Sequence, residues 1–255
     1  MTVLLNKNIA QQNTEQLRLS IQIDLSGFSF IIKDIKSGEI LYHAKESLPT
    51  NIHRVEDIEE YLDKFVKNEP LFLERYSGVS VYFDTEKYTL IPASLYRTGS
   101  DKDLLGKLYD LGEMDEIHTL DLPDFDTVMI YAIPNSITAP IYKICDNINF
   151  YPISLPLLLN NNRTVGVSNN RISVYYKKET IHVIATSGRQ LKLAGAYPAR
   201  DFITGSYFIF NSAKEVMFNP EHTSIYLYGH NITKDIQLLN RYFKKIKRCA
   251  LSEVL

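Results

Sequence analysis

One short stretch of the chain places an acidic side chain beside a turn of the kind that binds phosphate. Residues 21–33 read I-Q-I-D-L-S-G-F-S-F-I-I-K, with Asp24 at the end of a strand pattern and Ser26 and Gly27 just after it. Backbone N–H groups in such a turn can cradle a phosphate, and a neighbouring carboxylate can hold its Mg²⁺. A hairpin with an ordinary D-x-S-G turn accounts for the same residues and is the simpler interpretation.

The elements around this turn are those of a mixed α/β protein. Apolar and polar residues alternate on both sides of the turn, which predicts two strands. Val55, Ile58, Leu62 and Phe65 follow one another at spacings of three or four residues, which predicts an amphipathic helix over residues 55–66. The other elements expected in the first half are strands at 39–44, 79–83, 88–93 and 126–133, helices at 101–111 and from 134–136 onward, and an extended stretch at 150–159.

A related pattern returns in the second half. Residues 165–177, V-G-V-S-N-N-R-I-S-V-Y-Y-K, echo the first hairpin, and the polar triplet at 160–162 is the best candidate for a boundary. The elements expected there are strands at 165–167, 171–176 and 180–185, a helix at 200–216, a strand at 224–228 and a final helix at 233–249. Both halves follow the order β-β-β-α-β-α. This predicts a first lobe over 1–160, with an inserted subdomain near 100–126, and a second lobe over 161–255.

This order of elements resembles the actin-like ATPase superfamily, whose two lobes are ribonuclease-H-like. The phrases I-D-L-S-G-F-S, T-L-I-P-A-S-L-Y, D-F-I-T-G-S-Y-F and I-Y-L-Y-G-H carry the resemblance over nearly the whole chain. Within the superfamily the chain is similar to the pilus-assembly and cell-division actin-like group, and to an uncharacterised Bacteroidetes family of unknown function. The resemblance implies an α/β fold of two lobes, each with a mixed five-stranded-type sheet flanked by helices.

The resemblance also implies where a nucleotide would bind. The implied residues belong to two phosphate loops and an adenosine loop, and they are Asp24, Ser26, Gly27, Ser168, Asn169, Asn170, Gly229 and His230. The second phosphate loop of the superfamily carries another Asp, which the stretch 168–170 lacks. Because that carboxylate would help to manage metal and transition-state charge, we expect no hydrolysis and no catalytic residue. Binding of ATP with Mg²⁺ at Asp24 stays open, since N–H groups alone can hold phosphate.

Other familiar catalytic and metal-binding patterns are missing from the sequence. The 11 glycines form none of the motifs of dinucleotide-binding proteins, P-loop proteins or serine hydrolases. No two of the six histidines have the spacing of metal ligands, and His182 is interpreted as a structural residue of a strand. Asp121, Asp124 and Asp126 fit a loop that enters a strand, and Cys145 is expected to be packed. We therefore predict no metal site among these residues.

Basic residues gather near the end of the chain. Arg241, Lys244, Lys245 and Arg248 surround an apolar stripe in the predicted final helix. The simpler interpretation is a solvated basic face on a helix whose other face meets the core. The sharper alternative is a partner-binding patch for nucleic acid or an acidic protein. The net charge of −2 gives the whole chain no general attraction to nucleic acid or anionic lipid.

The chain as a whole has the features of a cytoplasmic protein. It has two cysteines, no signal-peptide pattern and no apolar run of membrane-span length. Our leading hypothesis is a non-catalytic actin-like adaptor or assembly scaffold with a degenerate nucleotide site, acting through a protein partner or self-association. Two alternatives stay open. One is a nucleotide-binding, ATPase-like or kinase-like switch, and the other is an RNA- or ribosome-associated accessory protein that uses the basic end.

Overall fold

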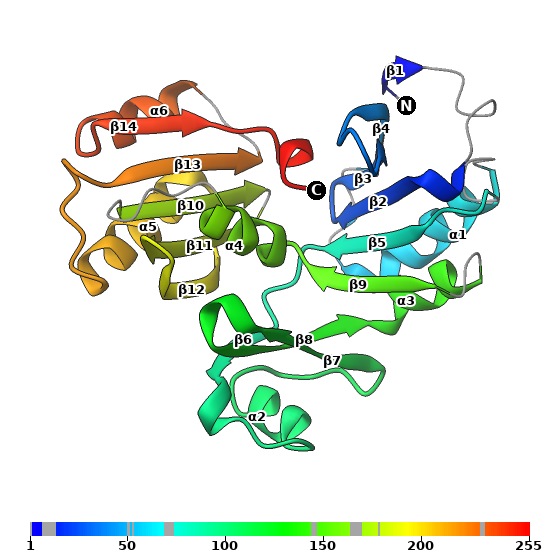
Figure 1. Cartoon of the computed structure of the whole chain (residues 1–255), viewed down its shortest axis with the longest axis horizontal. Helices are drawn as coiled ribbons and strands as arrows, with labels where there is room; N and C mark the ends of the chain where they lie inside the picture. Colours follow the sequence, from blue (N-terminus) through cyan, green and yellow to red (C-terminus); the bar gives the residue numbers. More distant parts are fainter. Residues whose placement is uncertain are drawn as a thin grey trace. The chain divides into compact units, whose positions relative to one another are not determined.

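The computed structural model describes residues 2–6, 14–49, 52, 54–68, 74–143, 147–163, 170–177, 179–229 and 233–255. The chain forms two compact units, each built on its own sheet (Figure 1). The first unit contains residues 1–84, 111–116 and 132–153, and the second contains residues 85–110, 117–131 and 154–255. These units are defined by contacts in space, whereas a lobe is defined by the order of its elements along the chain. The predicted lobe boundary at residue 160 and the predicted insertion at 100–126 therefore stay predictions.

The sheet of the first unit begins with an antiparallel meander. Its strands are β2 (Leu17–Asp24), β3 (Gly27–Asp34) and β4 (Ile40–Ser47). β2 also pairs in parallel with β5 (Gly78–Phe83), which pairs in parallel with β9 (Ile148–Pro152). A further strand, β1 (Thr2–Asn6), pairs with β4, so the order is β1-β4-β3-β2-β5-β9.

Two helices of the first unit pack against each other, α1 (Ile58–Asn68) and α3 (Asn135–Tyr142). α1 follows the short 3₁₀ helix Val55–Asp57, so the predicted helix at 55–66 is confirmed in its position. The apolar stripe of α1 packs against the sheet, as the Phe65 ring shows by stacking on the Phe30 ring of β3 with centroids 4.5 Å apart. The 3.6-residue period of the sequence therefore marks a real packing face.

A small three-stranded sheet lies between β5 and α3 in the sequence. Its elements are β6 (Tyr88–Pro92), α2 (Asp101–Gly106), β7 (Asp115–Leu122) and β8 (Thr127–Pro134), with strand order β6-β8-β7. β8 is the most apolar of the predicted strands and is the central strand here. Six consecutive residues, 128–133, are buried, which explains the continuous apolar run in place of alternation.

The second unit repeats the arrangement of the first. After α4 (Ser154–Arg163) come the antiparallel strands β10 (Asn170–Lys177), β11 (Thr180–Ser187) and β12 (Gln190–Pro198). They are followed by α5 (Phe202–Glu215), β13 (Ser224–Gly229), α6 (Thr233–Asn240) and β14 (Lys245–Arg248). The strand order is β12-β11-β10-β13-β14.

The two sheets share one topology once β1 is set aside. In each, the first strand lies between the second and the fourth, and the fourth and fifth strands run parallel to it. The predicted α/β fold of two ribonuclease-H-like lobes is confirmed.

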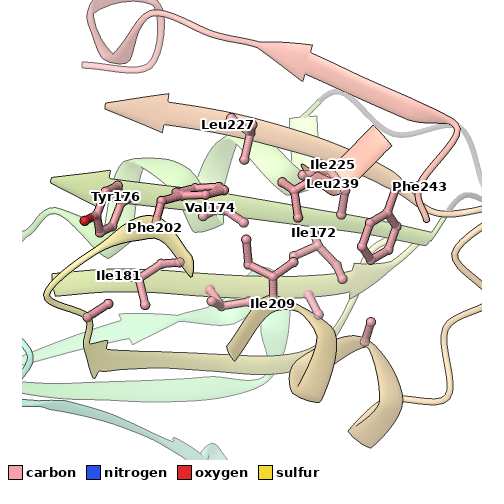
Figure 2. Close-up of a cluster of buried hydrophobic side chains, with 14 of the residues drawn as sticks. Ile172, Val174, Tyr176, Ile181, Phe202, Ile209, Ile225, Leu227, Leu239 and Phe243 are labelled. Carbon is pink, nitrogen blue, oxygen red and sulfur yellow. The ribbon is translucent and has the colours of Figure 1, made fainter. Parts of the chain in front are cut away.

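The core of the second unit lies between the sheet and α5, as Figure 2 shows. Ile172 and Val174 of β10 point toward Phe202 and Ile209 of α5, because alternate strand residues share a face. The side chain of Asp201 caps α5 by accepting the Thr204 N–H at 2.7 Å, which satisfies a donor that the first turn leaves unpaired.

The predicted helix over residues 233–249 is wrong beyond residue 240. α6 ends at Asn240, and residues 245–248 form β14. The buried side chains Leu239 and Phe243 have helical spacing, whereas K-I-K-R at 245–248 alternates with the period of a strand. β14 supplies the fifth strand of the sheet by pairing with β13, and this long-range pairing overrides the local helical pattern.

The predicted hairpin over residues 165–177 is also wrong. β10 forms its hairpin with β11, and its other edge is taken by β13. Residues 164–169 lie outside the described part of the chain. Residues 154–159, expected to be extended, are helical as part of α4. The edge strand β12 was not predicted, because its side chains are mostly half-buried and show no clear alternation.

Candidate functional site

The turn after β2 uses its acidic side chain internally. One carboxylate oxygen of Asp24 accepts the backbone N–H of Ser26 at 2.7 Å and also the Ser26 hydroxyl, and the other accepts the Gln22 side-chain amide at 3.1 Å. Asp24 is only 3% exposed. The Ser26 N–H, which would face a phosphate, is therefore already hydrogen-bonded to the Asp24 carboxylate, which would face the metal ion.

Gly27 has a packing explanation of its own. Its φ is +151°, and a Cβ atom at this position would lie 2.1 Å from the carbonyl oxygen of Glu46 in β4. The Leu48 N–H also donates to the Ser26 carbonyl at 2.9 Å, so the end of β4 covers the turn. Only glycine lets the two backbones approach this closely. The structure thus explains the D-x-S-G sequence as a tightly packed hairpin turn.

The counterpart of this turn in the second unit differs from the one expected. In the β2–β3 hairpin, the pair of residues next to the turn is Asp24 and Gly27. In the β10–β11 hairpin, the corresponding pair is Lys177 and Thr180. Lys177 therefore occupies the position that matches Asp24. Of the residues expected to form the second loop, Asn170 is the first residue of β10, and Ser168 and Asn169 lie outside the described residues.

The glycine of the expected adenosine loop is also explained by close packing. Gly229 ends β13 with a φ of +86°, and a Cβ atom there would lie 2.4 Å from the carbonyl oxygen of Tyr176. His230 lies outside the described residues. The need for glycine at this position comes from the neighbouring strand β10, to which Gly229 is paired.

The basic residues expected on a final helix lie on and just before an edge strand. Arg241 and Lys244 are in the turn after α6, whereas Lys245 and Arg248 are in β14, and all four are exposed. Lys244 forms an ion pair with Glu221 at 2.9 Å, and the pKa of the Glu221 carboxyl is lowered by this neighbour.

A buried polar group beneath α4 was not predicted from the sequence. Arg171 of β10 is only 2% exposed, and its guanidinium lies 3.7 Å from the centre of the Tyr226 ring. The Tyr228 hydroxyl accepts from Asn160 of α4 at 2.8 Å and from Arg171 at 3.3 Å. Burial, together with the Cys249 thiol, raises the pKa of Tyr228 to about 12.

This polar group holds α4 on the sheet face opposite α5. Asn161 of α4 accepts a hydrogen bond from the Ser173 hydroxyl of β10, next to the residues of the α5 core. The only sequence signal is a polar residue at alternate positions of an otherwise apolar strand. Buried polar side chains need partners to offset their desolvation, and these contacts supply some of them.

A groove of about 460 Å³ lies in the first unit, between the end of β4 and helix α1. Phe28 and Phe65 lie in its wall with ring centroids 5.8 Å apart, and Glu46 and Lys64 contribute charge. None of the site residues predicted from the sequence lines this groove.

The described residues contain no group of three or more His, Cys, Asp and Glu side chains placed to hold a metal ion. Of the three aspartates near β8, Asp124 accepts the Asn162 amide at 2.8 Å, and Asp126 ends a 3₁₀ helix with a positive φ. No helix in the described part of the chain has the length and apolar character of a membrane span.

Comparison with known proteins decides the family. Residues 6–246 match the model of DUF3822, described as a protein of unknown function. The chain belongs to this family. No curated protein matches the chain at a significant level.

Two solved structures show what this DUF3822 protein is similar to. A Bacteroides thetaiotaomicron protein with an actin-like ATPase fold and unknown function has a TM-score of 0.83 at 18% identity, over 96% of this chain and 94% of that one. A PilM-PilN type IV pilus biogenesis complex gives a TM-score of 0.55 at 10% identity, over 94% of this chain and 90% of that one. At these identities the matches establish the fold, and the predicted actin-like resemblance is confirmed.

Proposed function

We propose that this protein is a non-catalytic member of the actin-like fold that works as an adaptor or assembly scaffold for protein partners. The observation that carries the proposal is the closed hydrogen bonding of Asp24. Its two oxygens already accept from Ser26 and Gln22. A Mg²⁺ ion would have to compete with charge-assisted hydrogen bonds worth about 1.5–3 kcal/mol each, at a carboxylate that is almost wholly buried.

Lys177 supports the same proposal from the second unit. It stands at the position that matches Asp24, where a second acid would be needed to help hold a metal ion or a water molecule. A lysine can attract phosphate, but its ammonium group has no lone pair for a metal ion. The chain therefore lacks an acid at this position with which to manage metal and transition-state charge.

The similar fold of the PilM-PilN complex favours a protein partner over a small-molecule substrate. That structure is a complex of two proteins in type IV pilus biogenesis. In the present protein the partner would be a second protein chain, and self-association is the other form that a scaffold can take.

Titration calorimetry with Mg·ATP tests the proposal. We expect no binding tighter than about 1 mM and no phosphate release above the rate without protein. Chemical cross-linking in cells, followed by light scattering with each purified candidate, should yield a complex whose formation does not depend on added nucleotide. Micromolar Mg·ATP binding together with steady phosphate release would overturn the proposal.

A further inference from the structure

β14 has one edge with which no strand of the described residues pairs. It is the last strand of its sheet, and this edge is its outer edge. The Cys249 N–H donates inward to the Leu227 carbonyl at 2.9 Å, which sets the register of the ladder. Because alternate residues of an edge strand bond to opposite sides, the N–H and C=O groups of Ile246 point to the outer edge.

The side chains around this edge are strongly basic. Five cationic residues lie within eight positions, all of them exposed: Arg241, Lys244, Lys245, Lys247 and Arg248. Glu221 pairs with Lys244 at 2.9 Å, and Glu253 lies near enough to Cys249 to act on the pKa of its thiol. In a chain whose net charge is −2, this edge is a local concentration of positive charge. It would attract an acidic segment and repel a second copy of itself.

An apolar anchor stands next to the basic side chains. Tyr242 is 55% exposed, and its ring packs edge-on against the ring of Phe210 in α5, with ring centroids 4.8 Å apart. A partly exposed tyrosine held by a second aromatic ring is a typical contact at a protein interface, because it contributes area with little loss of side-chain freedom.

We propose that the outer edge of β14 is a docking site for an acidic, extended peptide segment, which adds to the sheet as a further strand. Backbone hydrogen bonds would supply strand pairing, and the lysines would select acidic side chains. Nucleic acid fits less well, since its phosphates can accept the N–H of Ile246 but offer no donor to the C=O group, as strand pairing requires. The inference rests on the proposed adaptor role and names the chemistry of its partner.

The test uses the full chain and a labelled synthetic peptide of alternating Glu and Val, followed by fluorescence anisotropy. A matched peptide carries N-methyl groups on alternate amides, so that it keeps the charge but cannot pair as a strand. Poly-uridine RNA of equal charge is the competing polyanion. The protein variants are Lys245→Glu/Lys247→Glu and Ile246→Pro. The control for charge is Lys102→Glu/Lys107→Glu, because both lysines are exposed and belong to α2 and its C-cap, not to β14.

We expect the acidic peptide to bind the wild type and the control variant, and to bind the Lys245→Glu/Lys247→Glu variant at least about tenfold more weakly. The N-methylated peptide should lose a similar factor, and so should Ile246→Pro if its circular dichroism is native. Equal binding of the two peptides, tighter binding of RNA, or no binding of the acidic peptide would overturn the proposal. Mg·ATP binding with unchanged peptide binding would instead remove the non-catalytic assignment and leave the docking edge standing.

Discussion

Replacing Asp24 by Asn distinguishes a structural acid from a functional one by the sign of the stability change. The wild-type carboxylate accepts hydrogen bonds from the Ser26 N–H, the Ser26 hydroxyl and the Gln22 amide. An Asn side chain keeps one acceptor oxygen for Ser26, but it presents an NH₂ group to Gln22. We therefore expect Asp24→Asn to destabilise the protein without any ligand present.

The size of the effect follows from these contacts. Loss of charge assistance and of one buried acceptor should cost about 1.5 kcal/mol in Asp24→Asn, and Asp24→Ala, which strands the Ser26 N–H, about 3 kcal/mol. For a chain of this size these losses correspond to falls in Tm of about 3 °C and about 6 °C. Thermal unfolding followed by circular dichroism measures them. Hydrogen exchange should rise first in the β2–β3 hairpin, because the lost contacts lie there.

Asp34 is the matched control for Asp24. Its carboxylate accepts the Ser37 N–H at 2.7 Å and the Ser37 hydroxyl at 2.9 Å in an exposed turn, so Asp34→Asn should change the Tm less than Asp24→Asn. A carboxylate kept for a metal ion carries unfavourable desolvation, and neutralising it would stabilise the free protein. An Asp24→Asn protein as stable as the wild type or more so, with weakened Mg·ATP binding, would refute the structural explanation.

Three further predictions test the packing around the predicted site. Gly27→Ala should cost about 3 kcal/mol of unfolding free energy, because the added Cβ would collide with the Glu46 carbonyl. Gly38 also has a positive φ, +70°, but a Cβ there would meet no atom within 4 Å, so Gly38→Ala should cost about 1 kcal/mol. Equal losses in denaturant unfolding would show that packing does not decide the cost. Tyr228→Phe removes the acceptor of two hydrogen bonds and should cost about 1–3 kcal/mol in the same assay, and an unchanged midpoint would show that the hydroxyl does not hold α4. The hydrogen bond that the Asp201 carboxylate accepts from the Thr204 N–H lowers the pKa of that carboxyl below its ordinary value of 3.8. The bond therefore stabilises the folded protein fully above pH 3.8, and this stabilisation is lost as the pH falls through the lowered pKa. Asp201→Asn keeps the cap and should remove this part of the acid sensitivity, measured as the unfolding midpoint against pH; an identical pH profile in the variant would contradict it.

Much of the fold could be predicted from short-range patterns. The alternation on either side of Asp24 predicts the β2–β3 hairpin, and the spacing of Ile58, Leu62 and Phe65 predicts α1. The order of strands and helices in the two halves was enough to indicate two lobes of one fold. These predictions hold because a strand or helix that buries one face must repeat its apolar residues with its own period.

The identity of the turns needed the tertiary structure. From the sequence, Ser168–Asn170 looked like the partner of the Asp24 turn, but the ladder register gives that place to Lys177. The same limit applies to β14, whose residues have apolar neighbours at helical spacing and yet complete a sheet through β13. Register and strand order depend on which segments pair across the chain, and local periodicity does not encode them.

The state of Asp24 shows most directly what the sequence determined and what folding decided. The sequence alone placed an acid, a serine and a glycine where a phosphate loop could form. Only the folded structure shows that the Asp24 carboxylate is occupied by Ser26 and Gln22, and that Gly27 is required by the carbonyl of Glu46, which lies on another strand. A residue type sets the chemistry that a side chain can perform, whereas the groups packed around it decide whether that chemistry is available to a ligand.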